Sequence, residues 1–199
     1  MSDLTQRVRA AIKQRIDEPT QSIAHRADHL KRVMQNASAI ATTLKGVDSE
    51  LLELAVLLHD VDQPVGRKSE HVALSVKAAK GILEQVGCPN ERAGLVLQII
   101  SEHSSEHVES MKPTSIEARI LFDADKLDGL GAIGISRVFS LFGQMNSSIK
   151  EAIPWYRRKI DLSLRHLQTD EGRRLCHTRL AFVLQFIDQL ESELSQSMN

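Results

Sequence analysis

The chain has 199 residues, of which 42% are hydrophobic, so it can bury one sizeable core and is expected to form a single domain over residues 1–199. Its formal net charge is −1 with the two signs interspersed, which argues against a binding surface for duplex nucleic acid or an anionic membrane. No apolar run approaches the ~20 residues that cross a bilayer, and the start lacks the apolar segment of a signal peptide, so we expect a cytoplasmic protein.

The first part of the chain predicts three helices. Residues 3–16 form an amphipathic stretch that ends before a proline. Residues 20–45 carry an apolar stripe at helical spacing, and a glycine stops that helix. The next helix opens at Asp48 or Ser49, which are both good N-cap residues, and it runs to Asp60.

The middle of the chain continues this pattern. After a loop, Ser69 is predicted to cap a helix that runs to about Val86. A glycine and a proline close that helix, and an apolar helix then runs from Asn90 through His103. A polar loop over residues 104–113 follows.

The last part predicts four more helices. Thr114 and Glu117 have the spacing of a capping box, before a helix that runs through Asp128. Three glycines after that helix predict a turn or a tightly packed helix junction. The remaining helical patterns cover about residues 135–143, 152–168 and 170–195. We therefore predict an all-α helical bundle.

The helix that ends in His59 and Asp60 points to a metal site. Nearly every position before that pair, in the run LLELAVLLHD, is apolar, and a helix that apolar belongs in the core. Two ionisable residues at the end of a buried helix suffer a large desolvation penalty unless something pairs with them. A divalent cation is the partner that suits both an imidazole and a carboxylate.

Two other predicted helices carry side chains that suit such a site. On the stretch 20–45, one polar strip at spacings of 4, 3 and 4 can face a cleft; it consists of His25, His29, Arg32 and Asn36. On the helix that ends at Asp128, Asp125 shares a face with residues expected to be buried, namely Ala118, Leu121 and Phe122.

Two carboxylates near Asp125 receive different interpretations. Asp128 follows it by one helical turn and is expected to orient a ligand. Asp123 points well away from Asp125, so we interpret it as structural.

Three motifs in this order resemble the HD superfamily of metal-dependent phosphohydrolases, which is named for the ordered set His, His-Asp, Asp. The match is carried by His29-Leu30-Lys31-Arg32-Val33, by Leu57-Leu58-His59-Asp60, and by DADKLDGLGAIGISR at 123–137. The motif core covers about residues 20–140, and helices over about 150–195 follow it. The tail at 174–194 is similar to the last helix of small stand-alone bacterial members.

The chain departs from the family pattern at three places. The family's His-Asp before the first ligand is His25-Arg26 here. The common Gly-Lys after the His-Asp pair is Val61-Asp62, and the usual Arg after the last ligand is Lys126. These departures limit which residue roles carry over from the family.

The ligand set implied by the resemblance is His29, His59, Asp60 and Asp125. Two imidazoles and two carboxylates without thiolate suit an octahedral divalent ion with open positions, with Mn²⁺ expected first and Fe²⁺, Co²⁺, Ni²⁺ or Mg²⁺ as alternatives. Open positions imply catalysis, in which the ion binds a phosphoryl oxygen and lowers the pKa of a water toward ~7. We expect one metal ion.

The other phosphate oxygens require cations and proton donors. The available cations are Arg67 and Lys68 in the loop after the His-Asp pair, Lys126, Arg137, and Arg32 on the polar strip. The family carries further histidines at the places of His71 and His103. The resemblance implies one of three roles for them: acid for the leaving group, contact to phosphate, or ligand of a second metal. We favour proton transfer and phosphate contact for them. With Lys126 and Asp128 they form the expected catalytic set.

The resemblance implies hydrolysis of a phosphoester or phosphoanhydride in a small nucleotide, and we favour release of phosphate or pyrophosphate from a nucleoside phosphate. A cyclic-nucleotide phosphodiesterase is disfavoured, because no GYP-type signature follows the His-Asp pair. A nucleotide-sensing module without turnover is the main alternative, and a helical interaction scaffold would have no reason to keep all four ligands. The base, the sugar, the number of phosphates and the native metal stay open, as does a homodimer through the long C-terminal helix.

Overall fold

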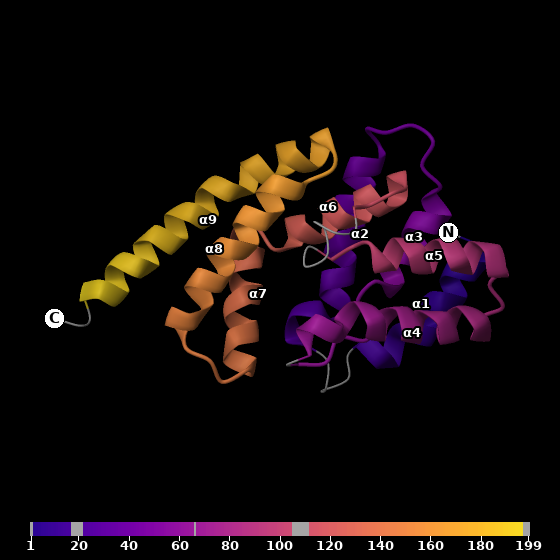
Figure 1. The fold of residues 1–199 in the computed structure, drawn as a ribbon, viewed down its shortest axis with the longest axis horizontal. Helices are drawn as coiled ribbons and strands as arrows, with labels where there is room; N and C mark the ends of the chain where they lie inside the picture. Colours follow the sequence, from indigo (N-terminus) through magenta and orange to yellow (C-terminus); the bar gives the residue numbers. More distant parts are fainter. Residues whose placement is uncertain (1, 17–21, 66, 105–111, 197–199) are drawn as a thin grey trace.

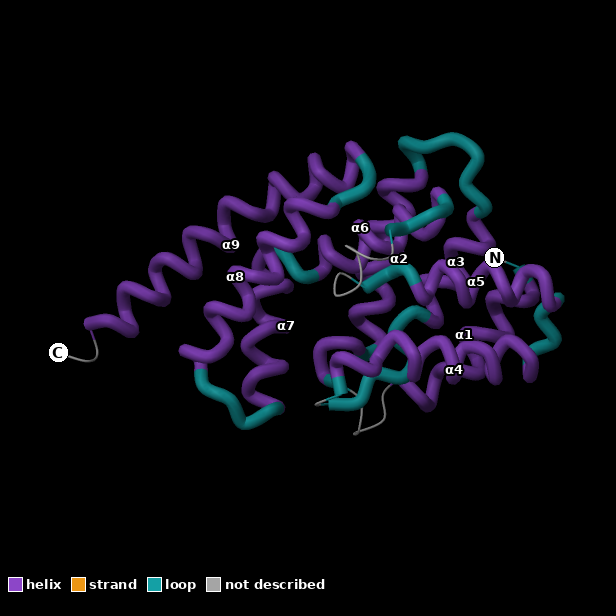
Figure 2. Tube along the Cα trace, viewed as in Figure 1, coloured by secondary structure: helices purple, strands orange, loops and turns teal. Residues whose placement is uncertain are grey.

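The computed structural model describes residues 2–16, 22–65, 67–104 and 112–196, and every regular element in these ranges is a helix (Figure 1, Figure 2). The prediction of an all-α, single-domain bundle is therefore confirmed. None of the described helices is long and apolar enough to cross a membrane. The α-helices are α1 (Asp3–Ile16), α2 (Ala27–Ala41), α3 (Ser49–Leu58), α4 (His71–Gln85), α5 (Asn90–Ser101), α6 (Ile116–Asp128), α7 (Gly131–Gln144), α8 (Ile149–His166) and α9 (Asp170–Gln196), and two short 3-10 helices are η1 (Ile23–His25) and η2 (Lys68–Glu70).

Helix α6 is the centre of the bundle, and it contacts α2, α3, α5, α7 and α9 (Figure 1). Its apolar residues Ile120, Leu121, Phe122 and Leu127 are fully buried. Because other helices surround it, four of its charged side chains are buried as well, namely Glu117, Asp123, Lys126 and Asp128. Each of these charges needs a partner inside the protein, since an unpaired buried charge costs several kcal/mol.

Helix α3 is the second buried element, as its apolar sequence predicts. Leu54, Val56 and Leu58 are fully buried, and Asp48 caps the helix by accepting a hydrogen bond from the Leu51 amide at 2.9 Å. The helix ends at Leu58, and its two ionisable residues, His59 and Asp60, follow while still buried in the core.

The stretch 20–45 forms two elements, whereas the sequence predicted one helix. Ser22 accepts a hydrogen bond from the Ala24 amide and starts η1, and Arg26 then takes an extended conformation (φ −82°, ψ −176°) before α2 begins. His25 is therefore not on the same helix as His29, and the predicted four-residue strip does not exist as such. An extended residue between two helical turns breaks the helical register.

Three predicted helix ends are also wrong. Ser69 lies inside η2, and α4 begins after Glu70 without a side-chain cap. The capping box before α6 is absent, because Ser115 caps that helix and Glu117 instead accepts from the Asp48 amide at 2.9 Å. Helix α5 ends at Ser101, so His103 lies beyond it. In the first two cases a turn or a tertiary contact replaced the local cap that spacing predicts.

The predicted glycine junction joins α6 to α7. Gly131 has a φ of +72°, which favours glycine, and a Cβ on Gly134 would lie 2.3 Å from the carbonyl carbon of Gly129. Tyr156 of α8, fully buried, donates to the Gly129 carbonyl at 2.9 Å. The glycines thus let α7 start directly against the end of α6. Helix α9 continues beyond the other helices toward the C-terminus (Figure 1).

Candidate metal centre

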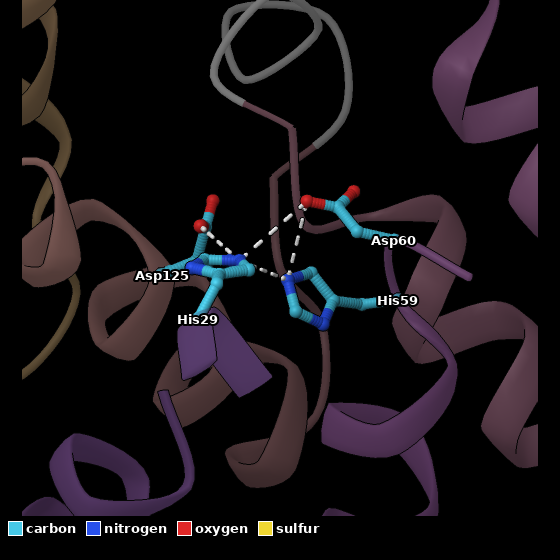
Figure 3. Close-up of side chains that lie close together, drawn as sticks. All are labelled: His29, His59, Asp60 and Asp125. Carbon is cyan, nitrogen blue, oxygen red and sulfur yellow. Dashed lines mark hydrogen bonds and ion pairs between the residues drawn. The ribbon is translucent and has the colours of Figure 1, made fainter. Parts of the chain in front are cut away.

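Four side chains that the sequence singled out meet at one place, from three parts of the fold (Figure 3). His29 comes from α2, His59 and Asp60 directly follow α3, and Asp125 comes from α6. One potential ligand atom of each lies within 4.8 Å of the others. His29 Nε2 is 3.2 Å from His59 Nε2 and 3.7 Å from Asp125 Oδ1, and His59 Nε2 is 3.4 Å from Asp60 Oδ2.

The opposite nitrogen of each imidazole is held by the protein. His59 Nδ1 lies 2.8 Å from the Val56 carbonyl oxygen, and His29 Nδ1 lies 2.7 Å from Asp128 Oδ2. A carbonyl oxygen and a carboxylate only accept hydrogen bonds, so each ring carries its hydrogen on Nδ1. The lone pairs of both Nε2 atoms consequently face the space between the four side chains, as metal-binding histidines require.

The charge state of this cluster is set by its surroundings. Burial lowers the pKa of His59 to about 4, so its ring is neutral at pH 7. Burial would raise the pKa of Asp125 and of Asp60, but Lys126 beside the first and the imidazoles around the second hold both values well below the usual range. Neutral imidazoles and ionised carboxylates are the forms that bind a divalent cation. The donor set thus fits such an ion in atom type, in tautomer and in charge.

Gln63 is a contact of this centre that sequence reasoning missed. With its amide nitrogen turned toward Asp60, it donates to both carboxylate oxygens, at 3.1 and 2.9 Å. It is 6% exposed and lies in the turn after α3. No helical periodicity applies in that turn, so only the folded chain reveals the contact.

His71 and His103 form a second group with Asp60, next to the first. His103 Nε2 is 3.3 Å from Asp60 Oδ1, and His103 Nδ1 lies 2.6 Å from the Ile100 carbonyl oxygen. Both rings are buried, and their centroids are 5.4 Å apart. The single carboxylate of Asp60 therefore joins the two groups.

His25 reaches the centre although it is not on α2. Its Nε2 is 3.8 Å from Asp60 Oδ2, and its ring stands edge-on to His29 with centroids 5.2 Å apart. Burial lowers its pKa well below the usual value. Five imidazoles thus stand in a row with neighbouring centroids 5.2 to 5.4 Å apart, in the order His25, His29, His59, His103 and His71.

Three of the cations expected to meet phosphate are bound to carboxylates of the protein itself. Lys126 donates to Asp125 Oδ2 at 2.5 Å and to the His103 carbonyl at 3.1 Å, and it is 5% exposed. Arg32 Nε is 2.6 Å from Asp128 Oδ1, and Arg137 Nη1 is 2.7 Å from Asp128 Oδ2. The carboxylates of Asp125 and Asp128 are thereby neutralised.

The two cations of the loop after the His-Asp pair are placed differently. Arg67 is exposed and pairs with Glu70 at 2.5 Å. Lys68 begins η2, and its side chain lies outside the described part of the structure. Residues 105–111, most of the polar loop predicted over residues 104–113, also lie outside the described part of the structure.

Asp123 and Asp128 have the different surroundings that the sequence predicted. Asp123 accepts from the amides of Gln168 and Thr169, each at 2.8 Å, and from the Thr169 hydroxyl at 2.6 Å. It thus ties α6 to the connection between α8 and α9. Asp128 faces the opposite way and contacts His29.

Comparison with known proteins assigns this fold and motif set to one family. Residues 26–130, more than half of the chain, match the HD domain. The uncharacterised protein YpgQ of Bacillus subtilis (strain 168) is 31% identical over 180 residues, which cover 87% of this chain and 86% of YpgQ.

Solved structures agree with this match. A crystal structure of YpgQ in complex with ADP superimposes with a TM-score of 0.71 at 27% identity, covering 95% of this chain and 97% of YpgQ. A predicted HD-superfamily hydrolase from an uncultured Thermotogales bacterium gives a TM-score of 0.58 at 29% identity, with coverage of 96% and 91%. A Lactobacillus plantarum protein shares the fold with a TM-score of 0.82 at 23% identity, with coverage of 98% and 99%. The chain belongs to the HD superfamily.

Proposed function

We propose that this protein is a metal-dependent phosphohydrolase that releases phosphate or pyrophosphate from a small nucleoside phosphate. The observation that carries the proposal is the convergence of two buried imidazole Nε2 lone pairs and two ionised carboxylates on one space. The complex of YpgQ with ADP supports a nucleotide ligand, and the hydrolase relative supports hydrolysis.

The metal ion would be held by His29, His59, Asp60 and Asp125. Imidazole and carboxylate donors suit Mn²⁺ best in our proposal, with Fe²⁺, Co²⁺, Ni²⁺ and Mg²⁺ as alternatives. When bound, such an ion polarises a phosphoryl oxygen and acidifies a water.

His103 is proposed to transfer a proton to the leaving group. Its Nδ1 hydrogen is used by the Ile100 carbonyl, so a transferable proton must sit on Nε2, 3.3 Å from Asp60 Oδ1. The Asp60 carboxylate can accept a hydrogen bond from that position. His71, whose ring stands edge-on to His103, is proposed to contact phosphate or to pass on the proton.

Positive charge for the phosphates is proposed to come from the loop after α3 and from α6. Arg67 and Lys68 are close in sequence to Asp60. Arg67 is exposed, so it could leave its ion pair with Glu70 and bind a phosphate group instead. Lys126 neutralises Asp125 and would also attract an anionic substrate. Arg32 and Arg137 are already bound to Asp128. They would therefore contribute to substrate binding by attracting its negative charge from a distance.

The test is product-resolved hydrolysis of nucleoside mono-, di- and triphosphates and cyclic nucleotides by metal-stripped protein resupplied with Mn²⁺. We expect Mn²⁺ to restore turnover in the wild type and in Asp188→Ala, which removes an exposed carboxylate on α9. Asp125→Ala is expected to stay inactive. The product then distinguishes release of phosphate from release of pyrophosphate.

A nucleotide-sensing module is the second candidate, because a complex with ADP also suits a protein that binds without turnover. It predicts that nucleotides bind in the presence of Mn²⁺ and none is hydrolysed. That result would contradict the proposed hydrolase. Turnover of cyclic nucleotides alone would instead favour a phosphodiesterase.

A further inference from the structure

We propose that Arg137 is a positioning residue of the metal centre, acting on His29 through Asp128. The inference rests on the proposed metal-binding role of His29. Arg137 was expected to bind substrate, but its guanidinium group is directed at the protein's own carboxylate, 2.7 Å from Asp128 Oδ2.

Asp128 is the link between this arginine and the ligand. It is 3% exposed, and the oxygen that faces Arg137, Oδ2, is also the oxygen that accepts from His29 Nδ1 at 2.7 Å. Arg32 donates to the other oxygen, Oδ1, at 2.6 Å through Nε, and to Oδ2 at 3.2 Å through Nη2. The position of one oxygen atom therefore sets the hydrogen bond that fixes the His29 ring, and Arg137 helps to set that position.

Arg137 is itself held in one position by hydrogen bonds, so it can fix the position of Asp128. Its Nε donates to the Ala24 carbonyl at 2.8 Å, Nη2 donates to the same oxygen at 2.5 Å, and Nη1 donates to the Asp128 carbonyl at 2.9 Å. A planar guanidinium that makes these bonds together has one orientation. The side chain thereby joins η1, the end of α6 and α7, and the tight Gly134–Gly129 contact brings α7 near enough.

The charges explain why an arginine is needed behind Asp128. Asp128 is buried, and the guanidinium groups of Arg32 and Arg137, at 2.6 and 2.7 Å, compensate the cost of burying its negative charge. Asp128 thus stays a carboxylate that can only accept, and His29 keeps its hydrogen on Nδ1. If Asp128 moved or turned, the hydrogen of His29 could shift to Nε2, the atom that must bind the cation.

The test is a double-mutant cycle on the affinity for Mn²⁺ alone, measured by calorimetry on metal-stripped protein without nucleotide. Its members are the wild type, Arg137→Gln, Asp128→Asn and the double variant. We expect Arg137→Gln to weaken Mn²⁺ binding about 10-fold, within the range found for partners behind a metal ligand. In the Asp128→Asn background, Arg137→Gln is expected to weaken Mn²⁺ binding little further, because the carboxylate through which Arg137 acts on His29 is already absent.

Arg179→Gln is the matched control. Arg179 also braces α6, by donating to the Leu127 carbonyl at 2.7 Å and to Asn36 Oδ1 at 2.9 Å, but it has no such contact with Asp128. It is expected to lower the unfolding midpoint while leaving Mn²⁺ affinity unchanged. Thermal unfolding and circular dichroism of every variant check the fold.

Arg137→Lys is the second variant, for the case that Arg137→Gln does not fold. It keeps the charge but cannot donate to Ala24 and Asp128 together, so the same loss of Mn²⁺ affinity is expected.

Two outcomes of the mutant cycle overturn the inference. One is an unchanged Mn²⁺ affinity in Arg137→Gln, and the other is an equal loss with and without the Asp128 carboxylate, which would show that Arg137 acts independently of it. A wild type that binds Mn²⁺ but hydrolyses no nucleotide would overturn the proposed function and leave this inference standing. A wild type that binds no Mn²⁺ would overturn both.

Discussion

His29 Nε2 and His59 Nε2 lie 3.2 Å apart, and each ring uses its Nδ1 hydrogen for a bond to the protein. Both Nε2 atoms face a space that the carboxylates of Asp60 and Asp125 also face. A divalent cation in that space would be attracted by all four groups. The two rings cannot rotate to move their Nε2 atoms away from this space, because Asp128 and the Val56 carbonyl bind their Nδ1 atoms.

Mn²⁺ is therefore expected to stabilise the folded protein. At about 100 times its Kd, linkage adds about 2.7 kcal/mol, which raises the unfolding midpoint by about 5–10 °C for a chain of this size. Thermal unfolding of metal-stripped protein with and without Mn²⁺ measures the shift. The shift should vanish in His59→Ala and persist in His177→Ala, which removes an exposed imidazole on α9. An equal shift in both variants would argue against this site.

The metal-free protein is expected to lose stability as the pH falls from about 6.5 to about 4. Burial lowers the pKa of His59 from 6.5 to about 4, so in this window the unfolded chain binds a proton that the folded chain does not. By this linkage His59 makes the protein about 2 kcal/mol less stable at pH 5 than at pH 7. Urea unfolding at the two pH values in the presence of chelator measures the difference, and His25 contributes in the same direction. His59→Ala should show a smaller pH dependence; an identical one would contradict the assignment.

Asp123 and Asp125, two residues apart on α6, are expected to give opposite phenotypes. Asp123→Ala leaves the buried donors of Gln168 and Thr169 without an acceptor, which should cost about 2–4 kcal/mol of stability and spare Mn²⁺ affinity. Asp125→Asn should greatly weaken Mn²⁺ binding at a smaller cost in stability, because its amide oxygen can still accept from Lys126. Calorimetry and urea unfolding of both variants test the contrast. Loss of metal affinity in Asp123→Ala, with the fold intact, would contradict a structural role.

Gly134→Ala is expected to destabilise the junction between α6 and α7. The new Cβ would lie 2.3 Å from the Gly129 carbonyl carbon and 2.4 Å from its oxygen, so α7 must move, at a cost of about 2–3 kcal/mol. Gly143→Ala in the same helix has nothing within 4 Å of the new Cβ and should be neutral or stabilising by about 0.5–1 kcal/mol. Thermal unfolding compares the two. Equal midpoints would show that the junction can open without cost.

Local pattern was enough to predict much of this protein. Apolar spacing predicted α1, α3 and α6 closely, and the apolar run before His59 and Asp60 showed that both residues end in the core. These inferences succeed because helical periodicity and desolvation depend on residues close in sequence. The ordered motifs also predicted which four side chains meet, since their flanking residues resembled a known family.

The partners of the charged side chains were decided only by the tertiary structure. Lys126, Arg32 and Arg137 read as phosphate ligands in the sequence, yet in the fold they neutralise carboxylates of α6. His25 reaches the centre from a separate turn, and Glu117 caps a distant helix start instead of its own. An ion pair depends on which opposite charge lies within about 4 Å, and that charge can be a hundred residues away along the chain. No periodicity in the sequence records such a distance.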